Sequence, residues 1–148
     1  MRRGLIGLFA AGLIGTISMT GCGRSTSVEG PPPDPTASRL RSITVAYAAA
    51  TTKLRRPPNN LQELKPFLKE QGNVDELLQS PRDGQPFEIV WGVDLNNPPA
   101  DFGAKKLVVA YEQQGSGGKR FVATQFDAVE MTEQEFAELN IPKSAPRK

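Results

Sequence analysis

Residues 106–126 read KLVVAYEQQGSGGKRFVATQF. Two runs rich in β-branched and aromatic residues, Lys106 to Glu112 and Lys119 to Phe126, flank the polar segment from Gln113 to Gly118. Runs of this kind, joined by a short glycine-containing loop, are typical of a β-hairpin. The stretch therefore predicts a pair of antiparallel strands in the C-terminal half of the chain.

Further strands are expected on both sides of this hairpin. In Phe87–Trp91 the odd positions are large and apolar, which is typical of a half-buried strand. The turn from Ser80 to Gly84 precedes it, with proline and Asp-Gly in favourable places. After the hairpin, a short strand is predicted at Val129 to Met131. Thr132 and Glu135 then form a capping box that predicts a final helix.

Helices are expected in the segment before the sheet. Thr36 is predicted to cap a long helix that runs to about Leu54. The stretch from Arg55 to Pro58 ends it, because proline disfavours helix in the residue before it. Asn60 and Asn73 are predicted to cap two short helices. Glu63 is predicted to complete a capping box with Asn60, and Pro66 to kink or restart that helix. Apolar residues of the long helix recur at steps of three or four and share one face: Leu40, Ile43, Tyr47, Ala50 and Leu54.

These elements predict an α+β fold. A long N-terminal helix should pack on a small antiparallel sheet of three or four strands, with short flanking helices. The domain is expected over residues 37–140, followed by a polar tail over 141–148. The residues expected in its core are Leu40, Ile43, Tyr47, Leu64, Ile89, Trp91, Leu107, Val109, Tyr111, Phe121 and Val129.

The N-terminus has the pattern of an export signal. Arg2 and Arg3 precede an apolar, glycine-rich run, and small residues lead to Cys22. The apolar stretch Leu5 to Met19 is shorter than the ~20 residues that a membrane-spanning helix needs. The pattern resembles a bacterial lipoprotein signal peptide over 1–21, although Met19 replaces the usual leucine. The resemblance implies that Cys22 is acylated and begins the mature chain, with a proline-rich tether over 22–36.

Composition excludes several kinds of chemistry. Removing residues 1–21 removes two of the 18 basic residues, which leaves 16 against 16 acidic ones, so the mature chain is neutral. A neutral domain has no electrostatic reason to bind nucleic acid. The chain has no histidine and only one cysteine, which excludes the usual zinc sites and histidine-dependent triads. We therefore expect no metal, no cofactor and no catalytic residue.

The order of the predicted elements resembles the globular head of the major pseudopilin of type II secretion. The resemblance covers residues 38–131. It rests on Tyr47 in the long helix, on Pro57-Pro58 after it, on Leu61 and Leu64, and on the stretch from Ser80 to Phe87. It implies a pilin-like head that binds another component of the cell envelope or of a secretion system.

Two features depart from that family. A pseudopilin keeps an apolar helix with a glutamate near its start, whereas this chain has no acidic residue before Glu29 and its apolar segment is expected to be removed. The acidic calcium loop of the family also has no good match. Asp94 and Asp101 are the nearest candidates for it, and solvated loop carboxylates are the favoured interpretation.

Other stretches allow both a functional and a structural interpretation. Residues 115–120 invite comparison with a phosphate loop, but Gln113 and Arg120 break that motif, so a flexible hairpin tip is favoured. Arg55 and Arg56 could touch lipid headgroups or form a solvated helix end. Trp91 could belong to a binding stripe, but core packing is favoured. Helix capping explains the acidic cluster Glu130, Glu133, Glu135 and Glu138.

The sequence thus predicts a non-enzymatic, lipid-anchored protein of the bacterial cell envelope. Its partners would be membrane lipid, through the acylated N-terminus, and an envelope or secretion-system protein. Its head would lie in the periplasm or elsewhere outside the cytoplasm. Two alternatives stay open: a ligand-binding or enzymatic lipoprotein that uses carboxylates or backbone groups, and a true pseudopilin that retains its N-terminal helix.

Overall fold

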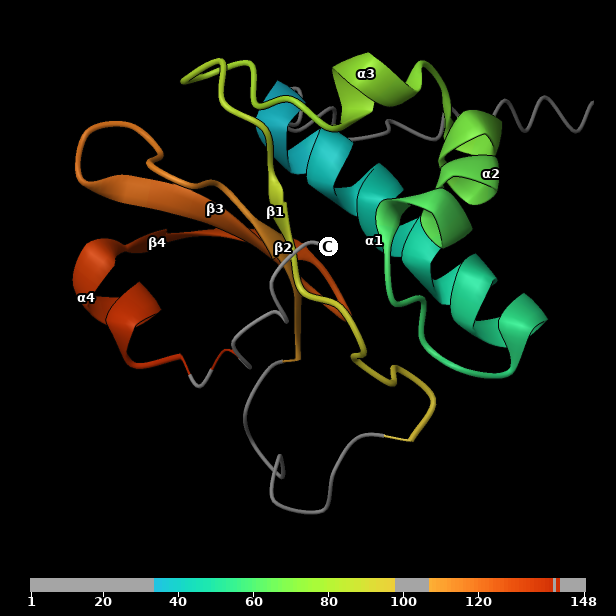
Figure 1. Cartoon of the computed structure of the whole chain (residues 1–148). Coiled ribbons are helices and arrows are strands. Elements are labelled where there is room, and N and C mark those ends of the chain that lie inside the picture. The colour runs from blue at the N-terminus through green and yellow to red at the C-terminus, as the bar shows by residue number, and fades with distance from the viewer. Residues whose placement is uncertain (1–33, 98–106, 140, 142–148) are drawn as a thin grey trace, which may run out of the picture. The chain divides into compact units, whose positions relative to one another are not determined.

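Three helices precede an antiparallel sheet, and a fourth helix follows it (Figure 1). The structure, a computed structural model, describes residues 34–97, 107–139 and 141. The predicted α+β class and antiparallel sheet are confirmed. The elements are α1 Pro35–Leu54, α2 Leu61–Gln71, α3 Val74–Leu77, β1 Glu88–Ile89, β2 Val108–Tyr111, β3 Lys119–Thr124, β4 Ala128–Thr132 and α4 Glu133–Ala137.

The sheet has four strands in the order of the sequence, β1-β2-β3-β4, and each strand is antiparallel to its neighbours. The hairpin β2–β3 predicted from the sequence is confirmed. Its register shifts between Val108 and Ala110. At its tip, Ser116 and Lys119 exchange backbone hydrogen bonds across Gly117 and Gly118. Both glycines have positive φ, which a two-residue hairpin turn with the right-handed twist of its strands requires.

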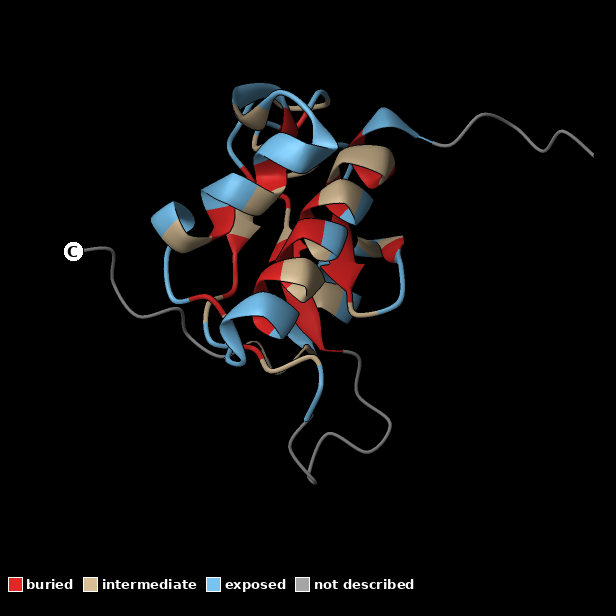
Figure 2. Ribbon diagram, turned by 90° about the vertical axis from the view of Figure 1, so that its right-hand side faces the viewer, coloured by how far each residue is buried: buried red, intermediate tan, exposed pale blue. Residues whose placement is uncertain are grey.

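Helix α1 contacts β2, β3 and β4, and α2 packs against α1 (Figure 1). Figure 2 shows the buried residues gathered along the helices and strands in the middle of the domain. The apolar face of α1 predicted from the sequence is buried at Leu40, Ile43, Tyr47 and Ala50, while Leu54 at the end of the helix is 36% exposed. The core therefore lies mainly between α1 and the sheet, and α2 covers α1 with Leu64 and Leu68.

The start of α1 differs from the prediction. The N-cap is Asp34, whose Oδ1 accepts hydrogen bonds from the backbone N–H groups of Thr36 and Ala37. Pro35 takes the first helical position, where its missing N–H costs nothing and its φ is already helical. Thr36 is therefore not the cap but a fully buried residue of the first turn. Pro35 and Thr36, which the sequence placed in the tether, belong to the helix.

The segment Phe87–Trp91 also differs from the prediction. Only Glu88–Ile89 forms a strand, and Val90 is as deeply buried as Ile89. The chain leaves the sheet after Val90, whose N–H still donates to the Val109 carbonyl, so side-chain alternation stops there. Trp91 is consequently half-buried rather than a core residue. Tyr111 and Val129, also predicted in the core, are half-buried as well.

Helix α2 passes through Pro66 without restarting. Asn60 caps it as predicted, since its side chain accepts from the Glu63 N–H. The predicted capping box is incomplete, because the Glu63 carboxylate accepts from the N–H of Asn59, one residue before the cap. Arg56 binds the same carboxylate with both terminal nitrogens, at 2.9 and 3.0 Å. These contacts connect the end of α1 to the start of α2.

Candidate functional site

The predicted acylation site, Cys22, lies outside the described residues, and so does Asp101. Within the described residues, no helix has both the length and the apolar character that crossing a membrane requires. The remaining candidate sites lie on the sheet, its turns and the helix ends, where their geometry can be compared with the predictions.

A buried polar cluster centres on Glu112, which follows β2 and is fully buried. Ser80 Oγ donates to Glu112 Oε1 at 2.6 Å, and the backbone N–H of Phe121 donates to Oε2 at 2.8 Å. Arg82 Nη1 lies 3.8 Å from Oε2. A buried charge is tolerated only when it is paired and hydrogen-bonded, and Glu112 has both kinds of partner.

Arg82 extends this cluster towards the surface. Its Nη1 donates to Glu130 Oε1 at 2.9 Å, and its Nη2 donates to the Ser116 carbonyl at 3.1 Å. The guanidinium carbon lies 5.0 Å from the centre of the Phe121 ring, within cation–π range. Arg82 thus ties the turn after α3 to the hairpin tip and to β4. Every donor group described here faces a protein partner, which indicates a structural rather than a catalytic cluster.

The glycine-rich segment 115–120 is the tip of the hairpin and leads into β3, not into a helix. The N–H of Gly115 donates to Asp83 Oδ2 at 3.1 Å, so one amide that a phosphate loop would aim at an anion is already bound. Arg120 donates to the backbone carbonyls of Glu112 and Gln113 and pairs with Glu133. The segment is therefore a hairpin tip attached to the turn at residues 80–84.

Three of the four acidic residues predicted near the start of α4 are engaged in structural contacts, whereas the fourth, Glu138, is the C-cap of the helix and not part of its N-terminus. Glu130 pairs with Arg82 and Lys119, and Glu133 pairs with Arg120. Glu135 completes the predicted capping box with Thr132, which is confirmed. Hydrogen bonds from the Thr132 backbone and hydroxyl lower the pKa of the Glu135 carboxyl. No pair of these carboxylates is left for acid–base chemistry.

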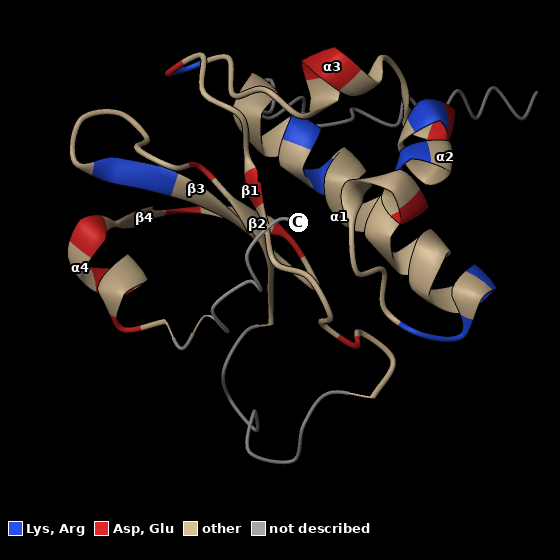
Figure 3. Cartoon of the chain, in the orientation of Figure 1, with Lys and Arg blue, Asp and Glu red and all other residues tan. Residues whose placement is uncertain are grey.

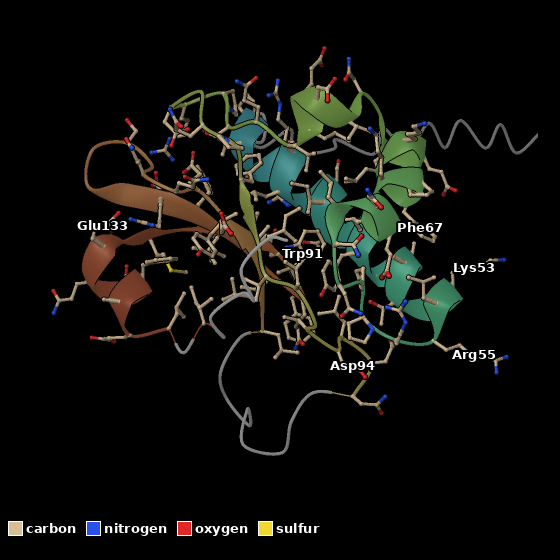
Figure 4. All side chains as sticks on the ribbon, in the orientation of Figure 1. Lys53, Arg55, Phe67, Trp91, Asp94 and Glu133 are labelled. Atoms are coloured by element: carbon tan, nitrogen blue, oxygen red, sulfur yellow. The ribbon has the colours of Figure 1, made fainter. Side chains whose placement is uncertain are left out.

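Asp94 follows β1 in the loop that the sequence compared with a calcium site. Its Oδ1 accepts from the N–H groups of Asn96 and Asn97 at 2.9 and 3.1 Å, and these backbone bonds lower the pKa of the carboxyl. Asp94 and Glu133 lie on opposite sides of the domain (Figure 4). Across residues 34–97 and 107–139, acidic and cysteine side chains form no cluster of three that could hold a metal ion.

Tyr47 and Trp91 belong to one structural contact region. The Val93 N–H donates to the Tyr47 hydroxyl oxygen at 3.0 Å, and the Gly92 N–H donates to the Pro58 carbonyl at 3.2 Å. Burial raises the pKa of Tyr47 to about 12. These bonds hold the chain after β1 against α1 and the residues that follow it. Trp91 packs against the core from this segment, which favours packing over an exposed binding stripe.

The end of α1 carries a distinct surface. Lys53, Leu54 and Arg55 are exposed there, and we call these three residues the basic corner. Figure 4 shows Lys53 and Arg55 projecting away from the domain. Neither side chain has a hydrogen-bond or ion-pair partner among the described residues. The corner is the one predicted interaction surface, through Arg55 and Arg56, at which cations remain available.

Sequence reasoning missed the Glu112 cluster. Two features of the sequence point to this cluster. One is an acidic residue directly after an apolar strand. The other is the presence of Ser80 and Arg82 in a turn for which no function was predicted. No spacing rule connects them, because Ser80 and Glu112 are 32 residues apart. Comparison with known proteins adds no further site, since no family model, no curated protein and no solved structure matches the chain significantly.

Proposed function

We propose that this chain is an exported lipoprotein, acylated on Cys22, whose head binds another protein of the cell envelope without catalysis. The observation that carries the proposal is the N-terminal pattern: Arg2 and Arg3, an apolar run too short to span a bilayer, and Cys22 after small residues. A bacterial lipoprotein carries more than one acyl chain, and anchoring by more than one chain is stable.

The fold supports a pilin-like head on that anchor. Helix α1 leads to two short helices, then to the turn at residues 80–84 and to an antiparallel meander. This is the order of elements on which the resemblance to the pseudopilin head rests. The buried Glu112 cluster would then have the role of holding the turn and the hairpin tip together. Loss of the apolar leader would remove the helix through which pseudopilins assemble.

The charged groups support a binding rather than a catalytic role. Glu112, Glu130 and Glu133 have cationic partners, and Glu135 is engaged in a helix cap. These four carboxylates are therefore occupied by protein partners and are not placed for general acid–base catalysis.

Affinity purification with the anchor intact tests the binding role. Membranes would be crosslinked, solubilised and purified through a tag on the C-terminus. We expect recovery of one defined envelope protein, and a weaker yield from Cys22→Ala because the head no longer stays at the membrane. Repeated recovery of no defined partner from the wild-type chain would contradict the binding role.

A further inference from the structure

The basic corner has more basic residues than acidic residues near it in the sequence. Residues 51–62 contain Lys53, Arg55 and Arg56 and no acidic residue. Arg56 is neutralised by Glu63, whereas Lys53 and Arg55 have no partner among the described residues. Figure 3 shows this end of α1 in blue. An excess of local charge on a mature chain that is expected to be neutral indicates a surface suited to an anionic partner.

An apolar side chain lies between these cations in the sequence. Leu54 is 36% exposed and belongs to the small set of large apolar residues that the described part of the domain leaves at its surface. Cations that stabilise the C-terminal end of a helix dipole account for Lys53. They do not account for the exposed leucine next to it. Cations that flank an exposed aliphatic side chain fit a bilayer surface, where headgroups bind the charge and the acyl boundary accepts the leucine.

The backbone at Arg55 strengthens this interpretation. Arg55 closes α1 with a φ of 55°, the left-handed conformation in which helices usually place glycine. A side chain at this φ costs about 1 kcal/mol or more relative to glycine. The Arg55 side chain makes no hydrogen bond or ion pair within the described residues that would offset this cost. A backbone outlier of this kind is an observation from which a functional contact can be proposed.

The proposed anchor places a bilayer within reach of the corner. The twelve residues from Cys22 to Asp34 (34 − 22) can span at most about 40 Å. Helix α1, with 20 residues, is about 30 Å long. A head attached at the start of α1 can therefore bring the far end of that helix to the same membrane. Tethering raises the effective concentration of the surface, so a weak contact is sufficient to orient the head.

We propose that the basic corner, made of Lys53, Leu54 and Arg55, docks on anionic phospholipid headgroups of the membrane that carries the anchor. This inference rests on the proposed acylation of Cys22. Docking would lay α1 along the bilayer and turn the sheet side of the domain towards a protein partner. An acidic protein surface is the competing occupant, and the experiment below separates the two.

The test uses the full acylated chain in vesicles of phosphatidylcholine, with and without phosphatidylglycerol. Asn59 is exposed beside the corner, and only its backbone N–H is engaged, so Asn59→Cys provides a labelling site for an environment-sensitive fluorophore. We expect blue-shifted emission and quenching by spin-labelled lipid only in vesicles that contain phosphatidylglycerol, and reversal by salt. The intact mass of the same sample reports acylation separately, so failure of docking and failure of the anchor are distinguishable.

Two substitutions at Arg55 and one matched control complete the test. Arg55→Gly suits the left-handed backbone and should preserve the fold while lowering the docked-to-free ratio about fivefold, the contribution of one cation near an anionic surface. Arg55→Glu should lower that ratio about thirtyfold, because it adds repulsion to the loss. Lys69→Glu makes the same charge change near the end of α2, outside the corner, and should leave docking nearly unchanged.

Equal label signals in the two kinds of vesicle would overturn the proposal. So would equal effects of Arg55→Glu and Lys69→Glu, since the response would then follow net charge and not the corner. Recovery of an acidic protein whose binding requires Arg55 in vesicles without phosphatidylglycerol would reassign the surface to that protein.

Discussion

Glu112 shows how one residue can join distant parts of this domain. Its carboxylate is bound by the Ser80 hydroxyl and the Phe121 backbone, and it lies beside Arg82. The turn at residues 80–84 has few apolar side chains of its own, so polar contacts must hold it on the sheet. The buried carboxylate therefore holds the turn in position through hydrogen bonds to two separate segments of the chain.

Replacing Glu112 with glutamine should destabilise the domain. The amide keeps one acceptor and loses the charge, which weakens the bonds from Ser80 and Phe121 and removes the partner of Arg82. We expect a loss of about 2 to 3 kcal/mol in the free energy of unfolding, measured by urea denaturation. Glu70→Gln is the control, because Glu70 is exposed and has no partner among the described residues. Equal stability of the two variants would show that the cluster is unimportant.

Tyr47 predicts a specific alkaline transition. Burial raises its pKa from 10.0 to about 12, so the fold favours the neutral phenol. The corresponding stability is complete below pH 10 and is lost as the pH rises towards 12, because the unfolded chain releases the proton first. Unfolding free energies measured across this range should fall more steeply for the wild-type chain than for Tyr47→Phe. Parallel slopes would contradict the assignment.

At the residue scale, the sequence predicted burial better than it predicted polar partners. The core positions Leu40, Ile43 and Tyr47 follow from helical spacing and are buried. The partners of Glu112 could not be predicted, because they meet only after α1, the turn and the hairpin have assembled. Thr36 and Asp34 are both good capping residues. Only the structure shows that Pro35 takes the first helical position, which makes Asp34 the cap.

Glycines at the hairpin tip determine the geometry of the connection between β2 and β3. Gly115 has a φ of +69°, and a Cβ there would lie 2.2 Å from the Lys119 carbonyl oxygen. Gly117 has a similar φ of +62° but open space around it. Substitutions at these two positions therefore distinguish the cost of a left-handed backbone from the cost of a steric clash across the hairpin tip.

Alanine substitutions at these two glycines should differ in cost. Gly117→Ala should lose about 1 to 2 kcal/mol of stability through its left-handed backbone alone. Gly115→Ala should lose roughly 3 kcal/mol or more, since the Lys119 carbonyl must also move. Thermal unfolding of both variants measures the difference. A cost at Gly115 no greater than at Gly117 would mean that the tip does not have the tight geometry described here.

At the element scale, local signals predicted most boundaries. The hairpin and the capping box at Thr132 and Glu135 depend on neighbours in sequence, and both are confirmed. The strand at Phe87–Trp91 was predicted from alternation, which assumes that one face of the segment is solvated. Here Val90 is buried as fully as Ile89. Alternation of apolar and polar side chains therefore could not predict where the strand ends.

At the scale of the whole molecule, the proposed acylation would hold the protein at a membrane and would exclude assembly through a retained apolar helix. The apolar leader corresponds to the segment that a pseudopilin keeps, and acylation at Cys22 would require its removal. A head held by lipid and oriented through the basic corner would present the sheet side of the domain to a partner. The resemblance to pseudopilins concerns the head alone, so the central claim is the acylated N-terminus.

The intact mass of the chain purified from membranes tests this claim most directly. The account predicts a polypeptide that begins at Cys22 and carries added acyl mass, and a Cys22→Ala variant that lacks acyl chains and is released from membranes or left unprocessed. A wild-type mass that includes residues 1–21, or a mature chain without acyl groups, would contradict the account.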